Sequence, residues 1–180
     1  MHSFTVTESI IHYDPELRES VAYGGTWPHS NHFGFVEAAT AAHYIQRGYN
    51  VLREFCTTSR EVRHSGLAYH STQLLHDIVG PEVSEYFTTE VAEVCRNGSG
   101  EPDLFMFRAF NPNDPKVSYP EGPSWFFAEV KGPRDVVREN QKLFWRRLVS
   151  RPDLGLGPDR LVLVRAVPVG ASVTPATIDY

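Results

Sequence analysis

The sequence has little cysteine, no excess of positive charge and no long apolar run. Its two cysteines, Cys56 and Cys95, are too few for a disulfide framework, so we expect reduced thiols in an intracellular protein. No stretch approaches the length of a membrane span, and the first residues show no signal-peptide pattern. The net charge of -5 argues against a generally basic nucleic-acid coat. Any contact with nucleic acid would therefore depend on local basic clusters.

The length and composition suit one globular domain. The chain has 180 residues, of which 41% are hydrophobic, and this is enough for a substantial core. Residues 1–30 are rich in turn formers and aromatics, so we expect an irregular arm or cap there. The single domain is then expected over residues 31–168, followed by a tail over residues 169–180.

The hydrophobic pattern predicts an alternation of helices and strands. Helices are expected over residues 33–48, 71–79, 81–96 and 135–149. Strands are expected over residues 49–56, 103–110, 125–130 and 160–167, with a further strand or turn near 61–64. The segment Asn111–Ser124 is packed with Pro, Asn, Asp and Gly, which predicts a loop. This order indicates a mixed α/β sheet flanked by helices.

Two short strings place carboxylates and one ammonium group on neighbouring strands. Asp103 closes a Gly-Glu-Pro-Asp string, and Glu129 and Lys131 lie two residues apart on the next strand. Because side chains alternate along a strand, Glu129 and Lys131 share a face. Sheet pairing could bring Asp103 beside Glu129, which would supply oxygen ligands for Mg²⁺ or Mn²⁺, with the carbonyl of Val130 as another. Lys131 would then orient an attacking water or help to deprotonate it.

Each string also has an ordinary explanation. A Glu-x-Lys on a strand is usually a solvated face, and Pro-Asp is a common turn. The helix after Lys131 adds a third feature, because Gln141 falls at helical spacing with apolar residues and is expected to face the sheet. A glutamine in that position is either a core amide with its own partners or an active-site amide.

The same helix carries a row of basic residues. Arg138, Lys142 and Arg146 are spaced by four, and Arg134 lies nearby. A row of this kind is most often a solvated face. Beside a metal site, it is also what the phosphate backbone of a nucleic acid would contact.

Taken together, these motifs resemble a known family. Gly-x-Pro-Asp-Leu, then Glu-Val-Lys-Gly-Pro-x-Asp, then a glutamine ten residues after the lysine are similar to the VRR-NUC branch of the PD-(D/E)XK nuclease superfamily. The resemblance covers residues 100–148 closely and implies a restriction-endonuclease-like α/β fold with a mixed central sheet flanked by helices. It also implies that Asp103 and Glu129 are metal ligands, that Lys131 is the catalytic lysine and that Gln141 is the motif glutamine.

The resemblance extends to a further residue and to an activity. Members often place a helix glutamate in the site, and Glu37 fits that role; the alternative is a surface or capping carboxylate. The implied reaction is metal-dependent hydrolysis of DNA phosphodiester bonds with Mg²⁺ or Mn²⁺. Stand-alone members act on branched DNA such as Holliday junctions, often as homodimers, and fused members trim flaps. The other interpretation is a non-catalytic module that retains the fold and binds nucleic acid or protein.

Two features depart from the family pattern. Members tend to carry a tryptophan three residues after the glutamine, where this chain has Phe144, with Trp145 next. An aromatic core residue is thus retained. The loop Asn111–Ser124 separates the two motif strands and is unusually long, so it could reshape access of the substrate.

Overall fold

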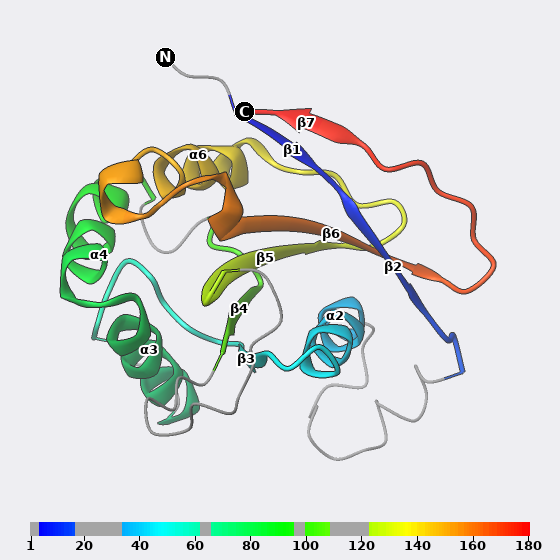
Figure 1. Ribbon diagram of the computed structural model, residues 1–180, viewed down its shortest axis with the longest axis horizontal. Helices are drawn as coiled ribbons and strands as arrows, with labels where there is room; N and C mark the ends of the chain where they lie inside the picture. The colour runs from blue at the N-terminus through cyan, green and yellow to red at the C-terminus, as the bar shows by residue number, and fades with distance from the viewer. Residues whose placement is uncertain (1–3, 17–33, 62–65, 96–99, 109–122) are drawn as a thin grey trace.

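A computed structural model of the chain describes residues 4–16, 34–61, 66–95, 100–108 and 123–180 (Figure 1). Its centre is a mixed five-stranded sheet in the order β2-β6-β5-β4-β3, and β1 pairs with β7 in a second sheet. The strands are β1 Thr5–Thr7, β2 Ser9–Tyr13, β3 Asn50–Leu52, β4 Leu104–Phe107, β5 Trp125–Lys131, β6 Leu161–Pro168 and β7 Thr177–Asp179. The helices are α2 Phe35–Ile45, α3 Gly66–Val79, α4 Pro81–Tyr86, α5 Ala92–Val94 and α6 Glu139–Leu148, with a π-helical segment η1 at Phe87–Val91 and 3-10 turns at Pro152–Leu154 and Pro158–Arg160.

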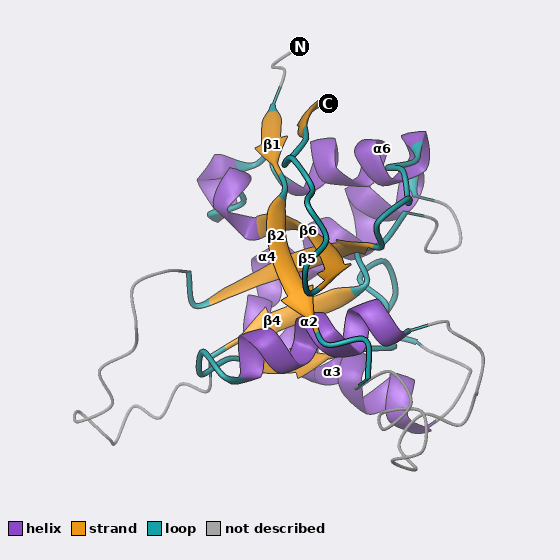
Figure 2. Ribbon diagram, turned by 90° about the vertical axis from the view of Figure 1, so that its right-hand side faces the viewer, coloured by secondary structure: helices purple, strands orange, loops and turns teal. Residues whose placement is uncertain are grey.

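Helices cover both faces of the five-stranded sheet (Figure 1, Figure 2). The α2 face packs around Met106, Phe126 and Val130, whereas the face covered by α3, α4 and α6 packs around Phe105 and Phe127. Neighbouring residues of β4 and β5 thus point to opposite faces, as the period of a strand requires. Burying one such Phe or Val side chain is worth about 1.5–3 kcal/mol. The expected mixed sheet flanked by helices is confirmed.

The strand expected over residues 49–56 is shorter than predicted. Strand β3 ends at Leu52, and Glu54 has a φ of 53°. A left-handed residue cannot continue an extended strand, so the chain turns away there. Residues 62–64 of the strand or turn expected near 61–64, and residues 109–110 of the strand expected over 103–110, lie outside the described residues, and Glu61 is not in a strand.

The helices follow the predicted order with shifted boundaries. Helix α3 begins five residues earlier than expected, and the helix expected over 81–96 contains the π-helical segment η1. Helix α6 begins at Glu139 rather than near Asp135, because Asp135 closes a turn by accepting the Gly132 N–H at 2.8 Å. Arg138 is then still extended, with φ -90° and ψ 155°. Within the described ranges, no helix has the length and apolar character of a membrane span.

The prediction of an irregular arm over residues 1–30 is wrong for its described part. Strand β2 runs parallel to β6, with Ile11 opposite Ala166, and so forms one edge of the main sheet. Strand β1 pairs antiparallel with β7, which lies in the predicted tail over residues 169–180. The physical reason is the high content of β-branched residues in the segment from Thr5 to Ile11, where only Glu8 and Ser9 are not β-branched; Ile11 is only 4% exposed. Both terminal segments therefore contribute strands.

Candidate active site

The candidate site lies where β5 runs past the end of β4. Strand register pairs Leu104 with Ala128, which sets Asp103 opposite Glu129. Asp103 does not continue the strand; its Oδ2 accepts the Val130 N–H at 2.7 Å instead. A carboxylate thus takes the place of a backbone partner at this edge. The expected approach of the two motif strings is confirmed.

Glu129 is the centre of a buried hydrogen-bonded group. The residue is 0% exposed, and its Oε1 accepts hydrogen bonds from Lys131 Nζ and from Gln141 Nε2. The other end of the Gln141 amide is fixed, because its Oε1 accepts the Arg138 N–H at 3.0 Å at the start of α6. Gln141 therefore faces the sheet as expected. The alternative that Glu129 and Lys131 form a solvated face is wrong.

Carboxyl groups are concentrated at this point, and burial disfavours their charged forms. Burial raises the pKa of Glu129 to about 8, the Asp103 carboxylate adds to the rise, and Lys131 opposes it. Burial likewise raises the pKa of Asp103, although the hydrogen bond from the Val130 N–H lowers it in part. Burial also raises the pKa of Glu37, and the charge of Asp103 contributes. The charge of Asp103 thus raises the pKa of both Glu129 and Glu37, which is a setting that a divalent cation would relieve.

The hydrogen bonding of two carboxylate oxygens shows whether a metal ion would suit this site. Among the described residues, Glu129 Oε2 and Glu37 Oε2 are buried and have no hydrogen-bond partner. Unpartnered buried oxygens are costly, and carboxylate oxygens are the ligands that Mg²⁺ and Mn²⁺ prefer. The donor set therefore fits a divalent cation chemically. In the part of the chain that the structure describes, however, no three His, Cys, Asp or Glu side chains are already gathered as a ligand set.

The backbone of Val130 faces the same edge. Its N–H donates to Asp103, and the N–H and carbonyl of one strand residue project to the same side. Metal ligation by Asp103, Glu129, Glu37 and the Val130 carbonyl stays a prediction.

The Gly-Glu-Pro-Asp string holds several parts of the site together. Gly100 has a φ of 94°, and a Cβ there would lie 2.3 Å from the Asn140 carbonyl oxygen. Glu101 Oε1 accepts the Thr57 N–H at 2.8 Å, the Thr57 hydroxyl at 2.6 Å and the Thr58 N–H at 3.2 Å. One end of the string thus touches α6 and its middle holds the loop after β3. No local pattern in the sequence marks Glu101, because its partners are more than 40 residues away.

Arg53 was also missed. It follows β3 directly and is partly buried, and its positive charge lowers the pKa of Glu37 and of Asp103 against the effect of burial. Arg53 therefore adds a second cation near the carboxylates, beside Lys131. The only sequence signal was an arginine within a predicted strand.

Of the basic row, Lys142 and Arg146 lie on α6, whereas Arg138 directly precedes the helix in an extended conformation and Arg134 lies in the turn before it. Arg134, Arg138 and Arg146 are exposed, and Lys142 forms an ion pair of 2.8 Å with Glu139. These positions agree with a solvated face and with a surface that phosphates could reach. Their role in binding nucleic acid stays a prediction.

A second buried ion pair braces the turn after Lys131. Arg165 on β6 donates from Nε to Glu8 Oε2 at 2.9 Å and from Nη2 to Glu8 Oε1. Its Nη1 donates to the Gly132 carbonyl at 2.7 Å and to the Asp135 carbonyl at 3.2 Å. The N-terminal segment thus supports the turn that leads from β5 to α6.

This brace gives a stability prediction. Glu8→Ala leaves Arg165 partly buried without its carboxylate, so the free energy of unfolding should fall by about 3–5 kcal/mol at neutral pH. Burial raises the pKa of Glu8, but hydrogen bonds from Arg165 and from the Ala176 N–H outweigh burial, and the net pKa is lowered from 4.5. The stabilisation is therefore present above about pH 4.5 and is lost as pH falls through the lowered pKa.

Urea unfolding at a series of pH values checks this prediction. The gap between wild type and Glu8→Ala should narrow as the pH falls below about 4.5. Glu93→Ala is the matched control, since Glu93 is exposed on α5. Equal losses in the free energy of unfolding of the two variants at neutral pH would show that the Glu8–Arg165 pair does not stabilise the fold.

Comparison with known families identifies the chain. The model of the VRR-NUC domain matches residues 37–155, which is more than half of the 180-residue chain. Comparison with curated proteins and with solved structures gave no match. The matched range begins at Glu37 and contains Asp103, Glu129, Lys131 and Gln141. The chain therefore belongs to the VRR-NUC domain family, a family of nucleases, and its mixed sheet with helices on both faces agrees with a restriction-endonuclease-like fold.

Proposed function

We propose that the chain is a metal-dependent endonuclease that hydrolyses phosphodiester bonds of DNA, with Mg²⁺ or Mn²⁺ as cofactor. The observation that carries the proposal is Glu129, which is buried against Asp103 and Lys131 while its Oε2 has no partner among the described residues. A structural ion pair would need neither the second carboxylate nor the unpartnered oxygen. Membership in a nuclease family supports the same chemistry.

Each residue of the site has a separate task in this proposal. A bound divalent cation would supply positive charge for the phosphate and lower the pKa of a water. Asp103 and Glu129 would hold that cation, with Glu37 and the Val130 carbonyl as further ligands. Lys131 donates to the attacking water or to a phosphate oxygen as negative charge develops. Gln141 keeps Glu129 in orientation through its amide N–H.

The preferred substrate is proposed to be branched DNA, such as a Holliday junction or a flap. Arg138, just before α6, and Arg146, on α6, are exposed and offer phosphate contacts, which fix a nucleic acid in place without reading its sequence. Selection by the shape of the DNA is then the natural form of specificity. A homodimer would place two sites on one junction. Cys56 and Cys95 are free thiols, which favours an intracellular location.

A cleavage panel tests this function. Purified protein should cut DNA in the presence of Mg²⁺ or Mn²⁺, and addition of EDTA should stop the cleavage. Cleavage should be fastest on a four-way junction or a flap. Duplex DNA, single-stranded DNA and RNA complete the panel. Asp103→Ala, purified in the same way, should be inactive on every substrate and so controls for a contaminating nuclease. Equal cleavage by wild type and Asp103→Ala would contradict the proposal.

Metal titration separates catalysis from the non-catalytic interpretation. Wild type should bind Mn²⁺ at a site that is lost in Asp103→Ala. A module that only binds nucleic acid or protein should show no Mn²⁺ site that depends on Asp103. That result, together with no cleavage of any substrate in the panel, would favour the non-catalytic binding module.

A further inference from the structure

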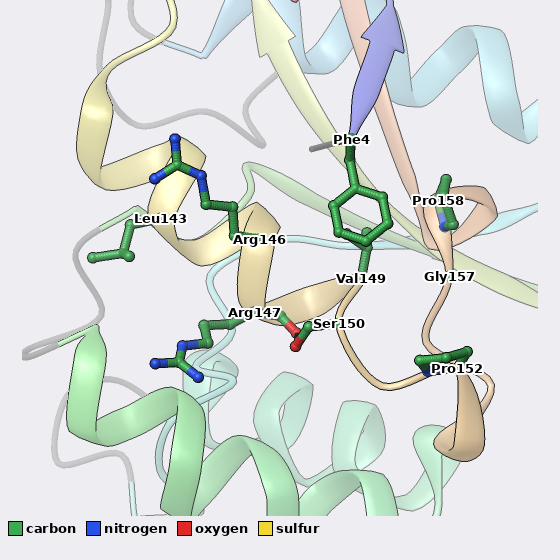
Figure 3. A pocket seen from close by; sticks show the side chains of 9 residues that line it. All are labelled: Phe4, Leu143, Arg146, Arg147, Val149, Ser150, Pro152, Gly157 and Pro158. Carbon is green, nitrogen blue, oxygen red and sulfur yellow. Dashed lines mark hydrogen bonds between the residues drawn. The ribbon is translucent and has the colours of Figure 1, made fainter. Parts of the chain in front are cut away.

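A hollow of about 760 Å³ lies beside α6, between this helix, Phe4 and the segment that contains Pro152 and Pro158 (Figure 3). Leu143, one of its lining residues, follows Gln141 by two positions, which places it about 200° around the helix axis. The hollow is therefore separated from Glu129 by the thickness of a helix. Its size falls in the range of binding sites for small molecules and single nucleotides.

The lining combines a flat apolar surface with two cations. The ring of Phe4 stands in the middle of the hollow, in front of Val149, with Pro152 and Pro158 to one side (Figure 3). Phe4 is held firmly, because its N–H and carbonyl both form 2.9 Å hydrogen bonds with the backbone of Tyr180. These bonds fix the backbone that carries the ring, and the ring itself packs partly against the core, with its centroid 6.2 Å from that of the Tyr180 ring.

The cations lie on the other side of the hollow. Arg146 and Arg147 line it from α6 and are exposed (Figure 3). Within the described ranges, neither guanidinium forms a salt bridge. Both charges are therefore available to an anionic ligand. A ligand that fits would carry a flat apolar group for Phe4 and an anionic group for the arginines.

The basic row connects this hollow to the candidate site. It runs from Arg138, whose N–H is bonded to Gln141, to Arg146 at the hollow. The eight positions from Arg138 to Arg146 span about 12 Å, which corresponds to at most about three to four nucleotides at the 3.4 Å per strand of duplex DNA and to fewer in an extended single strand. A strand whose phosphates follow the row would thus reach the hollow a few nucleotides from the catalytic residues.

We propose that the hollow binds an unpaired nucleotide of a DNA strand, with its base stacked on Phe4 and its phosphate between Arg146 and Arg147. The inference rests on the proposed function, since it takes DNA as the substrate. Aromatic platforms beside a cationic groove are how proteins bind single strands without reading sequence. An acidic peptide would also suit the arginines, but exposed cations at both Arg138, near the site, and Arg146, at the hollow, favour a polymer with repeated phosphates.

Binding of labelled single-stranded DNA tests this inference. Fluorescence anisotropy with a fluorescein-labelled oligonucleotide in EDTA measures affinity without cleavage. Phe4→Leu keeps much of the apolar volume but removes the flat ring, so the Kd should rise by about fivefold or more. Arg147→Gln should raise the Kd and make the salt dependence of binding less steep. Arg47→Gln, an exposed arginine at the end of α2, is the matched control and should bind like wild type.

An oligonucleotide with one abasic position tests the stacked base directly. Moving that position along the strand should reveal one place where loss of the base weakens binding to wild type but not to Phe4→Leu. Thermal unfolding shows whether Phe4→Leu keeps the wild-type fold. If it does not, the dependence of wild-type binding on the abasic position still tests for a stacked base.

The outcomes separate the inference from the proposed function. Wild-type affinity in both Phe4→Leu and Arg147→Gln would overturn the inference even where cleavage persists. Weaker binding by both variants, with no cleavage in the substrate panel, would support the nucleotide site and contradict the proposed nuclease activity. A change of oligomeric state in Phe4→Leu at unchanged DNA affinity would show that a second copy of the chain occupies the hollow, which also overturns the inference.

Discussion

Lys131→Met should lower the rate of DNA cleavage by at least about 100-fold, because loss of one positioned electrostatic donor typically costs this much in rate. The Lys131 ammonium group is buried and donates to Glu129 Oε1, so it stands beside the carboxylate that is expected to hold the cation. Methionine keeps the apolar length of the side chain and removes the charge. Cleavage time courses on the best substrate of the panel measure the loss.

Folding must be separated from catalysis in this experiment. Lys131→Met leaves Glu129 without its cation, and removal of one partner from a buried pair costs about 3–5 kcal/mol. The double variant Glu129→Gln/Lys131→Met removes both charges and should recover most of that stability, as urea unfolding would show. Its cleavage should stay as low as that of Lys131→Met, since stability alone does not restore the donor.

An exposed cation provides the control for the charge change. Arg47→Met removes a positive charge from the surface end of α2 and should cut DNA like wild type. If Lys131→Met retained more than a tenth of the wild-type rate while folded, the catalytic role of Lys131 would be wrong.

The parts of the site that follow from local periodicity could be predicted from the sequence. Glu129 and Lys131 share a face because strand side chains alternate, and Gln141 faces the sheet because of its helical spacing. The approach of Asp103 to Glu129 follows from antiparallel pairing of neighbouring strands. These relations need only a strand, a turn and a helix. Helix α6 nevertheless begins later than predicted, because the Asp135 side chain closes a turn first.

The supporting residues depend on contacts between distant parts of the chain. Glu8 and Arg165 are 157 residues apart, and Glu101 holds a loop 43 to 45 residues before it. No local pattern marks such partners, since each is an ordinary charged residue until the sheet order is known. The N-terminal strand was missed for the same reason. Its short β-branched run gains a partner only when β6 lies beside it.

Gly100 marks the point where the Gly-Glu-Pro-Asp string contacts α6, and it gives the second large effect. Gly100→Ala should lower the free energy of unfolding by about 3 kcal/mol or more. A left-handed backbone costs a non-glycine residue about 1–2 kcal/mol, and overpacking adds about 1–3 kcal/mol. The clash is with backbone that cannot rotate away, because the new Cβ would lie 2.3 Å from the Asn140 oxygen and 3.1 Å from the Gln141 nitrogen.

Gly48→Ala is the matched control for Gly100→Ala. Gly48 also has a positive φ, of 83°, but a Cβ there meets nothing within 4 Å, so only the backbone cost of about 1–2 kcal/mol applies. Urea unfolding of both variants then measures the part of the destabilisation that comes from the contact with α6.

Relief of the clash must shift the first turn of α6, which moves the Gln141 amide away from Glu129. Cleavage by folded Gly100→Ala should therefore fall more than tenfold, whereas Gly48→Ala should keep its activity. Equal stability losses and equal rates in the two variants would show that contact between the Gly100 string and α6 does not hold the site in shape.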